Sequence, residues 1–163
     1  MNVLLSVRPK WASLIAIGDK GAEARKSKPK LETPFRCFLY CTSIKSVNLD
    51  EYARIHAMTG GRIDKWQGRV FGEFTCEVIE EITKRHPKEK RTVHHIIDGD
   101  LAEKVLCMPL DELWAYSKDS DLYIWHISDL KVYEDPRPLS DFVCRKPLKM
   151  PPQSWCYVED PEI

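Results

Sequence analysis

The chain has 163 residues, 31% of them charged, and its 25 Lys and Arg residues balance its 25 Asp and Glu residues. The zero net charge excludes a protein that coats nucleic acid through an overall positive field, so any such contact must come from a local patch or pocket. The length is typical of a single domain. No stretch approaches the roughly 18 apolar residues of a membrane helix and no signal peptide pattern is present, so we expect a cytoplasmic protein.

The six cysteines are not spaced as zinc ligands. They include no Cys-x-x-Cys pair, and most fall in strand-like runs where cysteine behaves as a small apolar residue. We therefore expect free thiols, no bound metal and no cofactor. The sequence leaves the oligomeric state open.

The chain is expected to begin with a strand and a helix. Residues 2–7 are rich in Val and Leu, which is typical of a strand. Pro9 fits the first turn of a helix. The spacing of Trp11, Leu14 and Ile15 predicts that these three side chains form its buried stripe.

A polar and strongly basic segment follows. Gly18 suits the left-handed end of the helix, and the next residues carry four positive charges within six positions, at Arg25, Lys26, Lys28 and Lys30. Residues 35–42 are apolar on both faces, which predicts a central strand.

Residues 43–67 are expected to form a loop and helix insertion within one domain that spans residues 1–163. A short helix over residues 50–58 would be capped by Asp50, and Gly60-Gly61 would break the chain after it.

The next strand signal, over residues 67–79, is the clearest in the chain. Gly72 within it indicates a bulge or a close approach of another backbone. An exposed turn over residues 80–91 and a short strand over residues 94–97 are expected to follow.

Two short helices come next. Asp100 and Glu103 resemble a capping box for a helix over residues 101–107, and a second helix is predicted to begin at Pro109.

The last part of the chain reads mainly as strands. Strands are predicted over residues 122–127 and 130–133, with Pro136 and Pro138 ending the run. A helical turn over residues 139–144 and a final strand over residues 154–159 complete the pattern. This order lacks regular βαβ alternation, which favours an α+β fold: a mixed sheet curled into a small barrel with short helices packed around it.

The segment after the first helix carries the candidate chemistry. In a strand, Glu23 and Arg25 point to the same face, where a carboxylate and a guanidinium can hold an amide-like base edge. Lys20 can neutralise a phosphate, or act as a base or nucleophile if burial lowers its pKa. The ordinary alternative is a solvated turn. Among the aromatic residues, Trp155 beside Gln153 is the best candidate for stacking on a base.

This segment resembles the signature of the ASCH family in the PUA-like superfamily. That signature is Gly-x-Lys-x-x-Glu-x-Arg, matched here by Gly18, Lys20, Glu23 and Arg25 after Ser6, Val7 and Pro9. Further patches resemble the family at residues 68–74, 122–133 and 151–159, the last one in phage-type and Firmicute-type members of unassigned role. Residues 43–67 and 80–100 match nothing in the family.

The resemblance implies a PUA-like barrel and a cleft lined by residues 18–26. Related domains bind RNA, often near a modified base. Some small ASCH proteins remove the acetyl group from N4-acetylcytidine with a Lys, a Thr three residues later and a distant acid. Lys20 matches that Lys and Glu103 is the expected acid, but Glu23 stands in place of the Thr.

Three functions therefore stay open. The first is binding of RNA or a modified nucleotide by Ser6, Lys20, Glu23, Arg25, Lys26 and Trp155. The second is a hydrolase of a modified nucleoside or of RNA, in which Lys20 and Glu23 are the catalytic pair. The third is a protein-interaction module that keeps the fold without the ligand.

Overall fold

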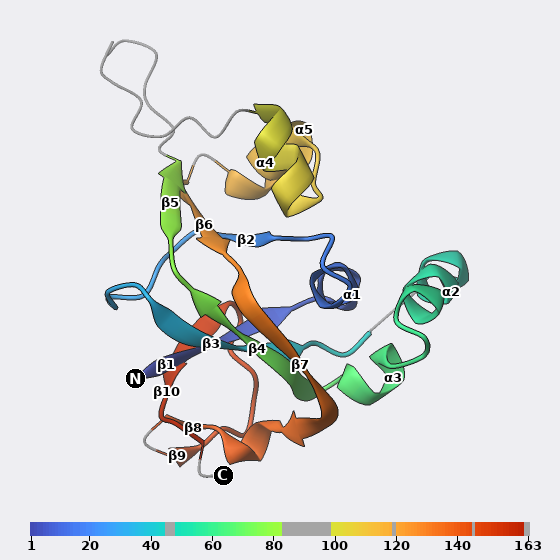
Figure 1. Cartoon of the computed structure of the whole chain (residues 1–163), viewed down its shortest axis with the longest axis vertical. Coiled ribbons are helices and arrows are strands. Elements are labelled where there is room, and N and C mark those ends of the chain that lie inside the picture. Colours follow the sequence, from blue (N-terminus) through green and yellow to red (C-terminus); the bar gives the residue numbers. More distant parts are fainter. Residues whose placement is uncertain (45–47, 83–98, 119, 145, 162–163) are drawn as a thin grey trace.

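The structure is a computed structural model, and it describes residues 1–44, 48–82, 99–118, 120–144 and 146–161 (Figure 1). A five-stranded sheet, a three-stranded sheet, a two-stranded sheet and several short helices make up this part of the chain. None of the described helices is long and apolar enough to cross a membrane.

The larger sheet has five strands. Their order across the sheet is β10 (Trp155–Val158), β1 (Asn2–Val7), β3 (Phe35–Cys41), β4 (Arg69–Cys76) and β7 (Ser128–Pro138). β1 and β3 run parallel, and the other neighbours are antiparallel. The central position predicted for residues 35–42 is confirmed, because β3 lies between β1 and β4.

The smaller sheet is antiparallel and has β6 (Leu122–His126) between β2 (Ala22–Arg25) and β5 (Ile79–Ile82). One apolar core joins the two sheets, since Trp125 of β6 packs in the same cluster as Val3, Leu5 and Phe35 of the larger sheet. Two short strands, β8 (Val143–Cys144) and β9 (Lys146–Pro147), form a separate hairpin. The mixed α+β class is confirmed, but the pairings among the described residues do not close into a barrel.

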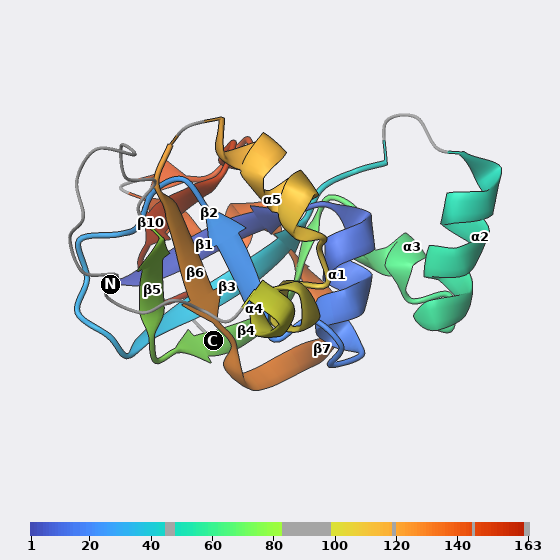
Figure 2. The same ribbon diagram turned by 90° about the horizontal axis from the view of Figure 1, so that it is seen from above.

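The helices are α1 (Pro9–Ala16), α2 (Leu49–Met58), α3 (Ile63–Trp66), α4 (Gly99–Leu106) and α5 (Leu110–Ser117), with a 3₁₀ turn, η1 (Leu139–Asp141). α4 and α5 cover the smaller sheet through a core that contains Ala22, Ala24, Leu106 and Leu113. α2 projects to one side of the sheets, as both views show (Figures 1 and 2).

Several local predictions are confirmed. β1 has the predicted bounds, Pro9 opens α1, and Gly18 has a left-handed backbone with φ +86°. The pairing of β4 shifts register at Gly72, where an added Cβ would lie 2.6 Å from the backbone oxygen of Lys131. Gly72 therefore allows β7 to approach β4 closely.

Other local predictions are wrong. Asn48, not Asp50, caps α2, because its side chain accepts a hydrogen bond from the Asp50 amide. The strand predicted over residues 67–79 ends at Cys76, and the chain then enters the smaller sheet as β5. Glu103 accepts a hydrogen bond from the Leu110 amide and so supports the start of α5. The strand predicted over residues 94–97 lies outside the described residues.

Candidate functional site

The turn between α1 and β2 places Lys20 beneath α4. Gly18 ends the helix, and the Lys20 amide donates to the carbonyl oxygen of Leu14. Next to it, the Gly21 amide donates to the Val105 carbonyl oxygen of α4. This double attachment fixes Lys20 between two elements that are distant in sequence.

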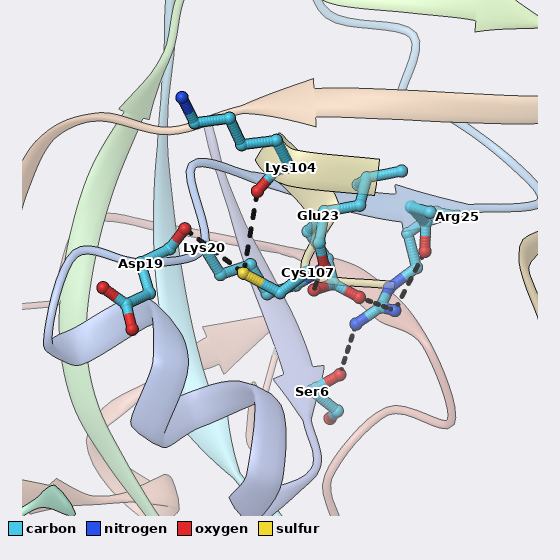
Figure 3. A network of polar contacts seen from close by, with 9 residues as sticks. Ser6, Asp19, Lys20, Glu23, Arg25, Lys104 and Cys107 are labelled. Atoms are coloured by element: carbon cyan, nitrogen blue, oxygen red, sulfur yellow. Dashed lines mark hydrogen bonds and ion pairs between the residues drawn. The ribbon is translucent and has the colours of Figure 1, made fainter. Parts of the chain in front are cut away.

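The alternation of β2 separates its polar and apolar side chains. Ala22 and Ala24 pack against α4 and α5, and their small size allows these helices to lie close to the strand. Glu23 and Arg25 occupy the opposite face, toward the larger sheet. Figure 3 shows these side chains together with Ser6 of β1.

Lys20, Glu23 and Arg25 form what we call the charged network. The Arg25 guanidinium donates to Glu23 Oε1 at 2.6 Å, to the Ala24 carbonyl oxygen at 3.1 Å and to the Ser6 carbonyl oxygen at 2.6 Å. Lys20 Nζ donates to the Leu106 carbonyl oxygen at 2.5 Å and lies 3.5 Å from Glu23 Oε2. Arg25 therefore links the two sheets, and Lys20 links β2 to α4.

The charged network is buried. Lys20 is 2% exposed, Glu23 is 5% exposed and the Arg25 side chain is 11% exposed. The expected pairing of Glu23 with Arg25 is present, but these side chains are buried and are not exposed in the cleft expected along residues 18–26. Two cations share one carboxylate in the interior, and such an arrangement is costly unless each charge is compensated.

The network does not use all of its hydrogen-bonding atoms. Glu23 Oε2 and Arg25 Nε are both buried and neither has a hydrogen-bond partner in the described structure. A buried donor or acceptor left in this way costs about 1–3 kcal/mol. Native proteins contain few such atoms, so the pair marks a place where a further polar group would be stabilised.

The Lys20 ammonium of the charged network has a shifted pKa. Burial lowers the pKa of Lys20 from its ordinary value of 10.5, and the neighbouring Glu23 carboxylate only partly opposes this.

This shift gives a pH-dependent prediction. Because the unfolded chain holds the Lys20 proton to higher pH, the free energy of unfolding should rise as pH increases from the lowered pKa toward 10.5. Lys20→Met removes this titration. We expect chemical denaturation at a series of pH values to show a steeper rise for the wild type than for Lys20→Met. Parallel curves would contradict a lowered pKa.

The other predicted ligand residues lie around the network and not in it. The Ser6 hydroxyl donates to the Pro152 carbonyl oxygen at 2.7 Å. Lys26 is exposed, with its ammonium 5.0 Å from the ring centre of Tyr116. Trp155 is half-buried, and its indole N–H donates to the Ser27 hydroxyl at 3.0 Å. The stacking surface expected at Trp155 is thus partly covered.

The sequence analysis did not predict two residues of the site. Trp11 is half-exposed instead of buried in the core, and its ring centre lies 4.8 Å from Lys20 Nζ. Cys107 follows α4 with a left-handed backbone, and its thiol lies close enough to affect the Lys20 charge. A non-glycine residue with positive φ has no sequence signature, so only the fold reveals Cys107.

Among the described residues, no three His, Cys, Asp or Glu side chains gather as metal ligands do. All six thiols are free. Glu103, the expected distant acid, instead contacts the amide of Leu110.

Comparison with known proteins identifies the fold. The structure of ASCH from Zymomonas mobilis superposes on this chain with a TM-score of 0.62 and a sequence identity of 15%. The aligned region covers 98% of this chain and 88% of the Zymomonas mobilis chain. A tyrosine-to-phenylalanine variant and a serine-to-alanine variant of that protein each match at 14% identity and a TM-score of 0.61. They cover 98% of this chain and 91% and 89% of their own lengths. No family model and no curated protein matches the sequence.

Proposed function

We propose that this chain, which has the fold of the ASCH structures, binds RNA or a modified nucleotide at the charged network. The observation that carries the proposal is a pair of buried atoms that make no hydrogen bond among the described residues, Arg25 Nε and Glu23 Oε2, the latter 3.5 Å from Lys20 Nζ. A carboxylate acceptor beside a guanidinium donor complements a base edge that offers both a donor and an acceptor. The shared fold supports the proposal, although it does not by itself assign a ligand.

The surroundings suit a polyanion. Lys26 and Lys30 are exposed on the segment that leaves β2, whereas Lys28 is paired with Glu81 at 3.2 Å. In a chain of zero net charge, this segment is a local source of positive potential. We assign Lys26 to phosphate attraction, and the buried network to recognition of the base.

Base entry requires a local movement, because the charged network is closed to solvent. Two hydrogen bonds from Ser6 to Pro152 and Ser154 hold residues 152–154 over the end of β1. The Trp155–Ser27 hydrogen bond closes the side next to Arg25. These contacts involve surface loops, which rearrange at lower cost than strands.

The test is a binding titration at fixed ionic strength with single-stranded RNA and with free nucleosides and nucleotides. Glu23→Gln keeps the shape of the side chain and removes the anionic acceptor. We expect it to weaken binding by about tenfold or more, given the roughly 1–3 kcal/mol of a good base contact. Glu81→Gln, on the surface pair with Lys28, is the matched control and should bind as the wild type does. Absence of any affinity in the wild type, or equal affinity in both variants, would refute the proposal.

A hydrolase is the second candidate, and the lowered pKa of Lys20 favours it specifically. A buried lysine with a lowered pKa is a better base or nucleophile than an exposed one, and Glu23 lies 3.5 Å away. Incubation with acylated cytidines and with RNA tests this function. Turnover should disappear in Lys20→Met, and turnover that persists in this variant would exclude Lys20 as the catalytic group.

A protein-interaction module accounts for the closed Glu23–Arg25 pair, but it gives no role to the two buried atoms that make no hydrogen bond, Glu23 Oε2 and Arg25 Nε. For this reason we place it third.

A further inference from the structure

Resting on the proposed nucleotide function, we propose that the site is selective for a uracil-type base, because three of its buried atoms make no hydrogen bond among the described residues and present a donor, an acceptor and a second donor. The third of these atoms is the indole N–H of Trp125, which is fully buried and has no hydrogen-bond partner.

The three atoms belong to one face of the smaller sheet. Glu23 of β2 is directly opposite Trp125 of β6, and Arg25 is opposite Tyr123. Side chains of directly opposed residues share a face, as do residues two apart on one strand. Trp125, Glu23 and Arg25 therefore share the face toward the larger sheet.

The order of the three side chains on this face follows from the register. Glu23 neighbours Trp125 across the ladder and Arg25 along the strand, whereas Trp125 and Arg25 are diagonal to each other. The Glu23 side chain is thus adjacent to both of the donor-bearing side chains. Arg25 is also tied to Glu23 Oε1 at 2.6 Å, which leaves Oε2, ion-paired with Lys20 Nζ at 3.5 Å but without a hydrogen bond, as the acceptor.

A base that matches this order must present an acceptor, a donor and an acceptor. Uracil does so with its two carbonyl oxygens on either side of N3–H. The other bases present a different order on the same edge. Cytosine has its donor at one end, guanine has two adjacent donors and a single acceptor, and adenine has only one donor and one acceptor. A mismatched base would leave a buried atom unpaired, which is the physical basis of strong discrimination.

Trp155 is placed to close over such a base. Its ring centre lies 6.0 Å from that of Trp125, and its N–H reaches Ser27, two residues beyond Arg25. Releasing the contact with Ser27 would free the Trp155 ring to stack on the incoming base.

Calorimetric titration with uridine, cytidine, adenosine, guanosine and 3-methyluridine tests the inference. 3-Methyluridine is the matched control ligand, because it keeps both carbonyl oxygens and lacks the N3–H that Glu23 would accept. We expect uridine to bind about tenfold or more tightly than each of the other four. Trp125→Phe should weaken the binding of uridine by about tenfold and reduce the difference in affinity between uridine and cytidine. Trp114→Phe, on the exposed surface of α5, should change neither quantity.

The outcomes separate this inference from the proposed function. Tighter binding of cytidine or a purine, or equal binding of uridine and 3-methyluridine, overturns the uracil selectivity and leaves nucleotide binding intact. Failure of every nucleoside and of RNA to bind overturns both. Circular dichroism of the Trp125→Phe protein shows whether it is folded, and the 3-methyluridine comparison on the wild type decides the question even if it is not.

Discussion

Replacing Arg25 with alanine is expected to lower the free energy of unfolding by about 3–5 kcal/mol, the range for removal of one partner from a buried ion pair. The change deletes the bonds to Glu23 Oε1 and to the Ser6 carbonyl oxygen, both at 2.6 Å. It leaves the Glu23 carboxylate buried with Lys20 Nζ, 3.5 Å away, as its nearest cation. The Ser6 carbonyl also loses its link to the smaller sheet.

Urea denaturation measures this effect, with Lys28→Ala as the control. Lys28 pairs with Glu81 at 3.2 Å, but both side chains are more than 40% exposed, so we expect a loss of only about 0.2–1 kcal/mol. Arg25→Lys keeps the charge and loses the planar fork that reaches two acceptors at once, and it should recover only part of the stability. Similar losses in the free energy of unfolding for Arg25→Ala and Lys28→Ala would show that the buried position of Arg25 adds nothing to stability.

The elements that sequence analysis predicted well are those whose signals are local. Residues 2–7 are mostly apolar, apart from Asn2 and Ser6, and β1 is buried along its whole length. Pro9 and Gly18 act through their own backbone preferences, and both mark the ends of α1 as expected. The pairing of Glu23 with Arg25 was predictable for the same reason, since period-2 alternation depends only on β2 being a strand.

Strand ends were predicted less well because they depend on tertiary contacts. β4 and β5 read as one strand, although the chain passes from the larger sheet to the smaller after Cys76. Pro136 and Pro138 were expected to end a strand, yet both lie in β7. β7 is an edge strand of the larger sheet, where a missing backbone donor faces away from the ladder.

The burial of the candidate site was not predictable from its own segment. Lys20 owes its burial to α4, whose Leu106 carbonyl oxygen, 86 residues away in the sequence, accepts a hydrogen bond from its ammonium. Trp11 has helical spacing that is typical of a core residue, but this part of α1 faces Lys20 instead of the main core. Long-range packing of this kind leaves no mark in local residue patterns.

Glu23→Ala is expected to destabilise the protein as strongly as Arg25→Ala, by about 3–5 kcal/mol, because it leaves the Lys20 and Arg25 cations buried without their shared carboxylate. Glu23→Gln should cost less, since its amide oxygen can still accept from Arg25. Equal losses for the two Glu23 variants would contradict this and show that the anion, and not the shape of the side chain, is what the network requires.

The double variant that combines Glu23→Ala with Arg25→Ala measures the coupling. If the two side chains act as one unit, the double variant should lose less stability than the sum of the single losses, by about 0.5–3 kcal/mol. The reason is that the second substitution removes a charge which the first has already left without its partner. Lys20 then remains as a single buried cation held by Leu106, and its lowered pKa allows it to lose its proton as pH rises. Strictly additive losses in urea denaturation would mean that the 2.6 Å Glu23–Arg25 contact contributes no coupling energy.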